Sequence, residues 1–313
     1  MSQIAQKAIE LVLGNVGQVI HGKDEAIKLV LSAWFSGGHI LIEDNPGTGK
    51  TMLAKSVARS VNAEFGRVQF TPDLLPSDVT GTTIYDEESK TFAFNRGPVF
   101  STILLADEIN RATPRTQSAL LEAMAEFQVT ADRNTYKLDS EFFVIATQNP
   151  IEQHGTFPLP EAQLDRFAMK ISMGYPARES EEELLKGRLT GDPFSKLQSV
   201  VKKEHVQEIK KAVAQVKLTE ATLKYILDVV QKTREHAEIM LPASPRGSLS
   251  LLKVAQAYTF IHGEDFVRPG TVYKLVPYVL SHRIALTTEA RFQGRTKTDI
   301  LKDVLDSVKV PTR

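Results

Sequence analysis

The chain has 313 residues, 42% hydrophobic and 24% charged, which is ordinary for a globular protein of about two domains. Basic and acidic residues number 38 each, so net charge gives no attraction to nucleic acid or an anionic membrane. Cysteine is absent, which excludes disulfides, thiolate metal sites and cysteine nucleophiles. Apolar stretches fall far short of the ~20 residues that span a bilayer, and residues 1–14 lack a signal-peptide pattern. We therefore expect a cytoplasmic protein without membrane insertion.

The first part of the chain alternates helical and strand patterns. Residues 3–13 and 23–34 carry apolar residues at helical spacing. Strands without polar alternation, spaced mostly by helices, indicate a parallel sheet buried on both faces. The expected fold class is therefore α/β, and its strands correspond to five apolar runs at residues 39–42, 67–70, 102–106, 142–146 and 168–173.

A phosphate-binding loop follows the first strand. Residues 44–51 read Asp-Asn-Pro-Gly-Thr-Gly-Lys-Thr, and glycines at this spacing let backbone N–H groups curl around phosphate oxygens. The next helix directs its N-terminal dipole at the same anion. Lys50 adds a positive charge, and the Thr51 hydroxyl can ligate Mg²⁺. We expect the nucleotide to contact Asn45, Pro46, Gly47, Thr48, Gly49, Lys50, Thr51 and Met52.

One position departs from the usual form of this loop. Asp44 stands where the pattern G-x-x-x-x-G-K-[ST] has its first glycine. A carboxylate beside phosphates repels them unless it points away. An ordinary glycine turn is the alternative for the loop, but the apolar run before it and the helix-compatible segment after it argue against that alternative.

Two β-hairpins are expected outside the sheet. Residues 82–85 and 91–95 flank a polar segment, with Phe92 and Phe94 on one face. Residues 128–131 and 135–138 flank the polar residues 132–134. Plain surface loops are the alternative, and for the first hairpin the sequence does not decide between the two.

Two carboxylates follow the apolar run at residues 102–106. At the carboxyl end of a buried strand, Asp107 and Glu108 face the crevice in which α/β sheets bind ligands. Asp107 would hold Mg²⁺, and Glu108 would polarise the attacking water as a general base. An acidic helix N-cap is the alternative, and the phosphate loop upstream favours the catalytic interpretation.

Two further polar residues stand next to expected strands. Asn149 follows the run at 142–146 and would contact the γ-phosphate or the lytic water; a turn residue before a proline is its alternative. Arg166 precedes the last strand, and an arginine that completes a neighbouring subunit's site is one interpretation. An ion pair with Asp165 or Glu161 is the other.

Beyond residue 176 the expected elements are helices. Residues 178–188 run from acidic to basic, as in a solvated helix that suits its dipole. We expect a nucleotide-binding core over residues 1–176 and a helical second domain over residues 177–313. Helical patterns in this second domain cover residues 203–216, 219–236, 246–262, 269–287 and 296–309.

Six segments occur in one order over most of the chain. They read Glu-Asp-Asn-Pro-Gly-Thr-Gly-Lys-Thr (43–51), Gln-Phe-Thr-Pro-Asp-Leu-Leu-Pro-Ser-Asp (69–78), Ala-Asp-Glu-Ile-Asn-Arg-Ala (106–112), Ala-Thr-Gln-Asn-Pro (146–150), Leu-Pro-Glu-Ala-Gln-Leu-Asp-Arg-Phe (159–167) and Ser-Pro-Arg-Gly (244–247). With these segments the chain resembles AAA+ ATPases of the MoxR family, in which aspartate at the position of Asp44 is a familiar variant.

The resemblance implies an AAA+ αβα core and a C-terminal helical lid, with the nucleotide in the crevice between them. It implies that Asn149 is sensor 1 and Arg166 the arginine finger. Arg246, at the start of a lid helix, corresponds to sensor 2; a capping or solvated arginine is its alternative.

Two further sets of residues gain roles from the resemblance. Residues 19–23 resemble the segment that contacts the base, which assigns Ile20, His21 and Gly22 to the nucleotide. In related proteins hairpins like those at 82–95 and 128–138 line the central channel of ring hexamers.

The resemblance also implies the function. We expect Mg²⁺-dependent ATP hydrolysis at the interfaces of a homo-oligomeric, hexameric ring, coupled to chaperone-like remodelling of protein clients with von Willebrand A domain partners. A helicase-like nucleic-acid motor is one rival, against which the zero net charge and the few basic residues near the first hairpin argue. A non-hydrolysing nucleotide-switch scaffold is the other, against which Asp107, Glu108 and Arg166 argue. No nucleic-acid partner is expected.

Overall fold

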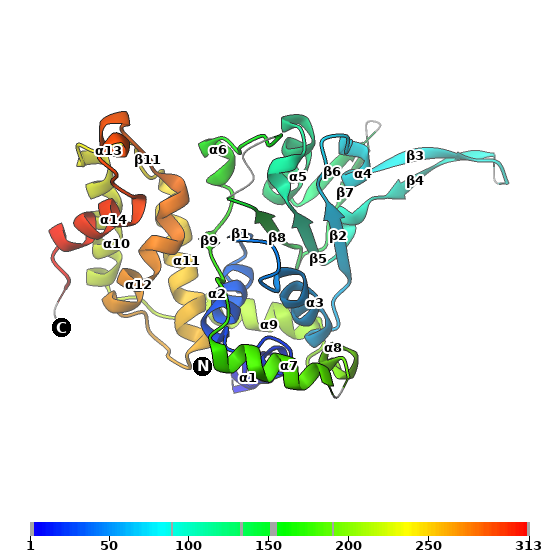
Figure 1. The fold of residues 1–313 in the computed structure, drawn as a ribbon, viewed down its shortest axis with the longest axis horizontal. Coiled ribbons are helices and arrows are strands. Elements are labelled where there is room, and N and C mark those ends of the chain that lie inside the picture. The colour runs from blue at the N-terminus through cyan, green and yellow to red at the C-terminus, as the bar shows by residue number, and fades with distance from the viewer. Residues whose placement is uncertain (1–2, 89, 132–133, 151–154, 190, 312–313) are drawn as a thin grey trace.

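The computed structural model describes residues 3–88, 90–131, 134–150, 155–189 and 191–311. A parallel sheet with helices against its faces forms one part of the molecule, and helices from the C-terminal third pack beside it (Figure 1). A two-stranded hairpin projects from the side of the sheet that lies away from the C-terminal helices (Figure 1).

The sheet confirms the predicted α/β class. Its order is β2-β5-β8-β1-β9, and every neighbouring pair is parallel. β5 and nearly all of β8 are buried along their length, which explains why these apolar runs carry no polar alternation. The strands are β1 (Ile40–Glu43), β2 (Phe65–Gln69), β5 (Ile103–Asp107), β8 (Phe143–Gln148) and β9 (Met169–Ile171).

Successive strand residues pack into opposite layers, as the period of a strand requires. Ile40 and Leu105 belong to one hydrophobic cluster with helices α1, α2, α3 and α9. Leu41 and Leu104 belong to the other cluster, with α5. The helices are α1 (Gln3–Gly17), α2 (Asp24–Phe35), α3 (Lys50–Ser60), α5 (Pro114–Glu126) and α9 (Glu204–Val213).

Both expected hairpins are present. The first joins β3 (Gly81–Asp86) to β4 (Thr91–Arg96), and the second joins β6 (Gln128–Ala131) to β7 (Asn134–Lys137); residues 132–133 of its turn lie outside the described residues. The rings of Phe94 and Tyr136 stack with centroids 4.1 Å apart, so the two hairpins support each other. α4 (Pro76–Thr80) leads into the first hairpin, and η1 (Pro98–Phe100) follows it.

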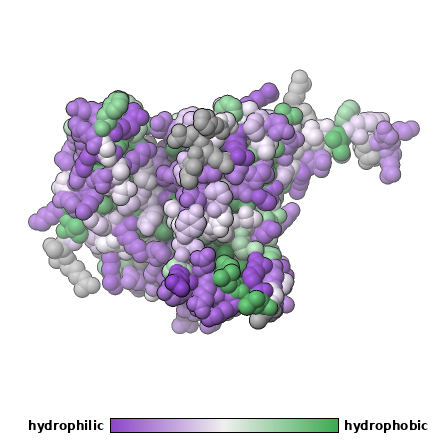
Figure 2. Space-filling model, in the orientation of Figure 1, coloured by the Kyte–Doolittle hydropathy of each residue, from purple (hydrophilic) through white to green (hydrophobic). Residues whose placement is uncertain are grey.

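The outer part of the first hairpin exposes apolar rings. Tyr85 and Phe92 are 53% and 75% exposed and contact each other, with centroids 5.2 Å apart. Figure 2 shows hydrophobic residues here and at the α7–α8 end of a face that is otherwise mostly hydrophilic. Leu185 and Leu189 of α7 (Arg178–Leu189) are among the exposed residues at that end.

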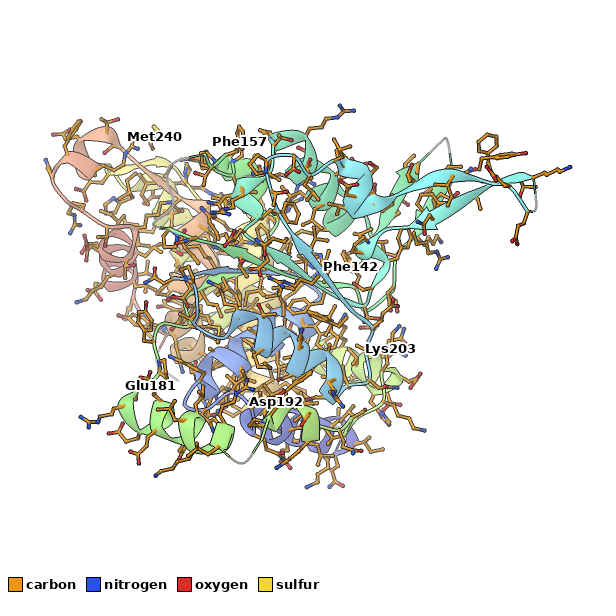
Figure 3. All side chains as sticks on the ribbon, turned by 45° about the vertical axis from the view of Figure 1, so that its right-hand side comes forward. Phe142, Phe157, Glu181, Asp192, Lys203 and Met240 are labelled. Atoms are coloured by element: carbon orange, nitrogen blue, oxygen red, sulfur yellow. The ribbon has the colours of Figure 1, made fainter. Side chains whose placement is uncertain are left out.

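After β9 the chain first packs against the core. The backbone N–H groups of Val200 and Val201 donate to the Ser60 carbonyl at 3.0 and 3.1 Å. The Asn15 amide donates to the Gln198 carbonyl at 2.9 Å. In Figure 3 Glu181 of α7, and Asp192 before α8 (Pro193–Lys196), lie on the opposite side of the molecule from Met240. Residues 198–201 therefore lie against the core helices α1 and α3, and a boundary at residue 176 stays a prediction.

The C-terminal helices differ from the expected pattern at one place. The prediction of one helix over residues 269–287 is wrong after residue 280. Pro277 lies inside α12 without ending it, and the helix stops because Ala285 and Leu286 pair with β10 instead. The elements are α10 (Glu220–Glu235), β10 (Ile239–Leu241), α11 (Pro245–Ile261), α12 (Pro269–Leu280), η3 (Ser281–Arg283), β11 (Ala285–Leu286), α13 (Thr288–Phe292) and α14 (Lys297–Ser307).

A buried arginine joins these helices to the sheet. Arg283 is 3% exposed, and its guanidinium donates to Asp165 Oδ1 at 2.8 Å and to the Phe167 carbonyl at 2.6 Å. It also donates to Ser250 Oγ of α11 at 2.9 Å. Burial lowers the pKa of Arg283 to about 10, so the group stays charged at neutral pH. None of the described helices has both the length and the apolar character needed to cross a membrane.

The pH dependence of unfolding tests the burial of His39. Its Nδ1 accepts from the Val144 N–H at 3.0 Å, and burial lowers the His39 pKa from 6.5 to about 4. Between these values the unfolded chain binds the proton and the folded one does not, so the free energy of unfolding decreases as pH falls. His39 should account for about 2 kcal/mol of the decrease from pH 7.5 to pH 5.

Urea unfolding at both pH values should therefore show a smaller loss in His39→Gln than in the wild type. Val129→Ala, in the adjacent buried cluster, is the matched control that lowers stability but keeps His39. An equal loss in all three proteins would contradict the assignment.

Candidate functional site

The phosphate loop connects β1 to α3. Gly47 and Gly49 have φ angles of 83° and 90°, in the left-handed region that glycine adopts without strain. Gly49 is the N-cap of α3 and makes no side-chain cap. The first backbone N–H groups of the helix are therefore available to an anion, as the loop pattern predicts.

Lys50 is held inside the loop. Its Nζ donates to the carbonyl oxygens of Asp44 and Asn45, 2.8 and 2.9 Å away. Burial lowers the pKa of Lys50, and the charges of Asp44, Asp107 and Glu108 oppose that shift. Phosphate oxygens bind an ammonium more strongly than neutral carbonyls do, so a nucleotide would draw Lys50 away from these contacts.

Asp44 turns away from the loop. Its Oδ2 accepts from the N–H groups of Met173 and Gly174 at 2.6 and 2.9 Å, and Ser172 Oγ lies 3.3 Å from Oδ1. The carboxylate thus closes the end of β9. This orientation removes the repulsion that an acidic residue at the first position of the loop would cause.

Asp107 is fixed by two partners. Thr147 Oγ1 donates to Asp107 Oδ1 at 2.6 Å, and Arg67 Nη2 donates to Oδ2 at 2.8 Å. Thr147 Oγ1 in turn accepts from the Glu108 N–H at 2.8 Å. One threonine of β8 therefore holds both positions of the carboxylate pair after β5.

Glu108 directs its side chain to the same edge of the sheet. Its backbone is left-handed, with φ 56° and ψ 51°, before η2 (Ile109–Arg111), and it makes no side-chain cap. Its Oε2 lies 3.0 Å from Gln69 Nε2 and 3.1 Å from Arg111 Nε. These contacts argue against the helix-cap alternative.

Residues 46–52 of the phosphate loop and the predicted catalytic residues Asp107, Glu108 and Asn149 line one cavity of about 410 Å³. Polar groups from the carboxyl ends of β2, β5 and β8 face the loop across this cavity. Ligands of α/β sheets bind at the carboxyl ends of parallel strands. The lining residues are 46–52, Lys55, Arg67, Gln69, Asp107, Glu108 and 147–149.

A second cavity of about 210 Å³ shares Gly47, Thr48, Gly49 and Met52 with the first. Ile20 and His21, the predicted base contacts, line it together with residues of α7 and α8. A base and ribose can therefore lie next to phosphates in the loop.

Two predicted contacts, Gly22 and Asn45, do not line this second cavity. Gly22 does not line it; a Cβ there would lie 2.1 Å from Ser180 Oγ, so the glycine permits close approach to α7. Asn45 lines neither cavity and places its Nδ2 3.5 Å from the Tyr175 hydroxyl.

Arg67, Gln69 and Thr147 were not predicted. Gln69 lies opposite Asp107 in the parallel register of β2 and β5, and Arg67 lies two residues earlier on the same side of β2. A sequence signal for these three residues does exist. Each is polar and lies near the carboxyl end of an expected strand, and the adjacent strand ends in carboxylates.

Arg166 and Arg246 lie elsewhere. They line a third cavity, of about 330 Å³, with residues 36–39 at the amino end of β1. The phosphate loop begins at the carboxyl end of β1, and the four residues of that strand span roughly 13 Å. The two arginines are thus brought together, but at the opposite edge of the sheet from their own chain's loop.

The C-terminal helices lie near Arg166 and Arg246 and not near the phosphate loop. Within the described residues, neither nucleotide cavity is lined by any residue beyond Pro193. Leu184, Arg188 and Pro193 of the predicted helical domain line the second cavity, so a nucleotide between the core and that domain stays a prediction, whereas Arg246 lines neither cavity. The lid packs beside β9 and presents Arg246 at the amino edge.

Asp165, next to Arg166 in the chain, contacts two residues of the C-terminal helices, Ser244 and Arg283. Its Oδ2 accepts from Ser244 Oγ, at the N-cap of α11, at 2.9 Å, and its Oδ1 pairs with Arg283. Arg166 donates instead to the Leu121 carbonyl at 2.6 Å. The ion-pair alternative for Arg166 and Asp165 is therefore not what the structure shows.

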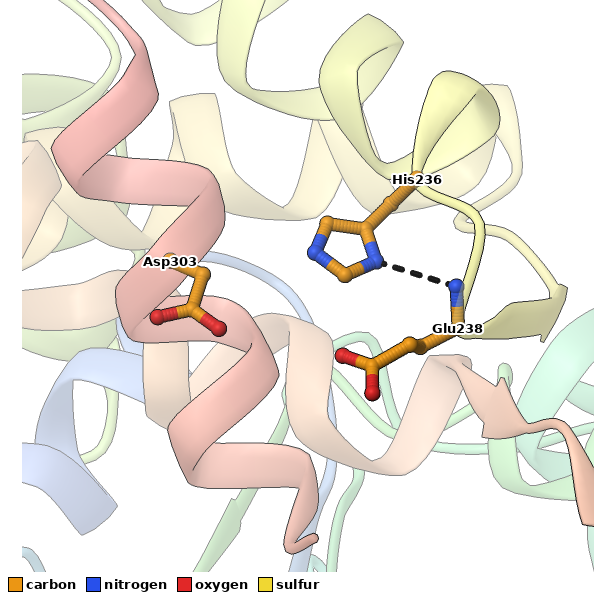
Figure 4. Close-up of side chains that lie close together, drawn as sticks. All are labelled: His236, Glu238 and Asp303. Atoms are coloured by element: carbon orange, nitrogen blue, oxygen red, sulfur yellow. Dashed lines mark hydrogen bonds between the residues drawn. The ribbon is translucent and has the colours of Figure 1, made fainter. Parts of the chain in front are cut away.

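One group of possible metal ligands lies in the lid. Donor atoms of His236, Glu238 and Asp303 come within 4.8 Å of one another, and Nδ1 of the histidine accepts from the Glu238 N–H (Figure 4). Arg295 forms ion pairs with both carboxylates. The Arg295 guanidinium therefore already neutralises charge on the two carboxylates, and these ion pairs link the segment before β10 to α14.

Comparisons with known proteins agree with this arrangement. The model of the "ATPase family associated with various cellular activities (AAA)" matches residues 39–169, and the model of the "AAA lid domain" matches residues 231–304. The crystal structure of a proposed ATPase from Cytophaga hutchinsonii is similar, with a TM-score of 0.91 and 40% identity over 98% of this chain and 96% of that one.

Related sequences extend along the whole fold. Chaperone MoxR1 of Mycobacterium tuberculosis is 37% identical over 97% of this chain and 82% of its own length. Protein MoxR of Paracoccus denitrificans is 30% identical over 86% of each chain. The uncharacterised protein YeaC of Bacillus subtilis is 46% identical over 98% of this chain and 95% of its own. The chain belongs to the MoxR family of AAA+ ATPases.

Proposed function

We propose that this protein hydrolyses ATP with Mg²⁺ at the interfaces of a homo-oligomeric ring and uses the reaction to remodel protein clients. The separation of the two arginines from the phosphate loop carries this proposal. A guanidinium that stabilises charge on the transferring phosphoryl group has to reach the γ-phosphate. Arg166 and Arg246 are poised to do so in a neighbouring copy, whose carboxyl edge meets the amino edge of this one.

Residues on the cavity wall fit the bound groups. Gly47 and Gly49 cradle the phosphates, and Lys50 neutralises the outer ones. Thr51 and Asp107 line the same cavity and offer the hydroxyl and carboxylate oxygens that Mg²⁺ prefers. When bound, the ion would offset charge on the phosphate oxygens.

The remaining residues act on the attacking water. Glu108 accepts a hydrogen bond from it and draws off its proton as it attacks the γ-phosphorus. Asn149 is buried at the end of β8 and lines the same cavity, where its amide orients the water or the γ-phosphate. Glu108 in this position also counts against a non-hydrolysing switch.

A protein client fits the exposed surface. The first hairpin offers Tyr85 and Phe92, and apolar rings favour a protein surface over a phosphate backbone. The name of the related Chaperone MoxR1 supports the same kind of client. A hexameric ring and a von Willebrand A domain partner rest on the family resemblance.

Glu108→Gln should keep ATP binding but reduce turnover at least ~10²-fold, because the water loses its general base. Nucleotide affinity and steady-state phosphate release measure the two effects. Glu126→Gln, at the end of α5, is the matched control and should behave as the wild type. Unchanged turnover in Glu108→Gln would overturn its catalytic role.

Arg166→Ala should bind ATP nearly normally and hydrolyse it roughly 10³-fold or more slowly, the scale of an arginine finger. Lys50→Ala should bind ATP weakly, because the outer phosphates lose their nearest cation. Mixing the two inactive variants should restore part of the turnover, because an intact arginine edge then faces an intact loop. Native mass spectrometry establishes that mixed assemblies form, and no rescue in those assemblies would place Arg166 in its own chain's site.

Arg246→Ala should also bind ATP, hydrolyse it slowly and regain turnover in a mixture with the right partner variant. Arg166 and Arg246 lie at the same end of the sheet in one subunit. In a mixture of Arg246→Ala and Arg166→Ala every subunit lacks one of the two arginines, so turnover should stay low if each interface needs both. Mixing Arg246→Ala with Lys50→Ala should restore turnover. Equal turnover in both mixtures, or a lower melting temperature with normal activity per folded molecule, would favour a capping role for Arg246.

A further inference from the structure

Arg67 places a positive charge on the carboxylate assigned to the metal. Its Nη2 lies 2.8 Å from Asp107 Oδ2, while Thr147 Oγ1 occupies Oδ1. The same Nη2 lies 3.0 Å from Gln69 Oε1, a second partner of the arginine on its own strand. Both oxygens of Asp107 are therefore engaged by protein donors.

The pair is placed so that it can open. The Arg67 side chain is 47% exposed on the edge strand β2, whereas that of Asp107 is 12% exposed. Because the arginine of this pair is half exposed, water can replace its contact with the carboxylate, and the pair contributes modestly to stability. Arg67 can swing towards solvent or phosphates, and Asp107 stays where Thr147 holds it.

A fixed guanidinium and a divalent cation exclude each other at one carboxylate. Two positive charges within a few ångströms repel strongly at the low effective dielectric of a cleft. The same guanidinium attracts the negative charge of a nucleotide that arrives without a metal. Arg67 thus has opposite effects on the two ligands of one cavity.

We propose that Arg67 is a placeholder cation, a positioning residue that occupies the metal side of Asp107 and is displaced when Mg²⁺ binds. The inference rests on the proposed function for the identity of the site. Arg67 lowers the affinity of the nucleotide-free protein for the metal and keeps the Asp107 carboxylate in place. Metal entry is thereby made to depend on the nucleotide.

Equilibrium binding tests this without turnover. Mn²⁺ titrations followed by electron paramagnetic resonance, without nucleotide, compare wild type, Arg67→Gln and Arg67→Lys. Arg67→Gln should bind Mn²⁺ about 1.5- to 5-fold more tightly, the factor expected for one partly exposed ion pair. Arg67→Lys keeps the charge and should lie close to the wild type.

A fluorescent ATP analogue without divalent cation gives the second arm. Arg67→Gln should bind it more weakly than the wild type by a similar factor, because the phosphates lose a cation. Lys55→Gln is the matched control: it removes a charge that lines the same cavity, and in the described part of the chain Lys55 forms no ion pair with Asp107. It should raise Mn²⁺ affinity less than Arg67→Gln does.

Opposite changes in the two affinities support the placeholder role. Weaker or unchanged Mn²⁺ binding in folded Arg67→Gln would overturn it. A wild type that binds neither the analogue nor Mn²⁺ would instead overturn the proposed function, so the two failures are distinct.

Discussion

The common direction of the five strands in the central sheet is the constraint on which the rest of the structure depends. Because they are parallel, one edge collects the carboxyl ends and the opposite edge the amino ends. The phosphate loop, the carboxylates and Asn149 lie at the first edge, and Arg166 and Arg246 at the second. Under the proposed function one copy completes the next by a head-to-tail contact, and such contacts close into rings when the rotation permits.

Much of the carboxyl edge could be predicted because its residues are neighbours in the chain. The loop and Asp107-Glu108 each follow an apolar run, so a local pattern indicates both the strand and the side chains at its end. Gln69 and Thr147 were missed because their positions depend on strand register. A pattern of apolar residues shows that strands exist, but it does not show which residues lie side by side.

The place of the lid could not be predicted for a similar reason. Helical periodicity shows which face of a helix is apolar, but it does not show which part of the core covers that face. Arg283 determines where the lid packs on the core, because its guanidinium pairs with Asp165, 118 residues away in the chain. Asp165 adjoins Arg166, and its partner Ser244 lies two residues before Arg246. The contacts of Asp165 with Ser244 and Arg283 therefore fix the two backbone segments that carry Arg166 and Arg246 relative to each other.

The left-handed backbone of Glu108 lowers the stability of the fold at a residue that the proposed function needs for catalysis. A side chain other than glycine in this region costs on the order of 1 kcal/mol or more, and glycine or asparagine would relieve that cost. Neither replacement can act as the general base. Selection for thermal stability alone would therefore tend to remove this carboxylate, and under the proposed function Glu108 is a position where turnover outweighs stability.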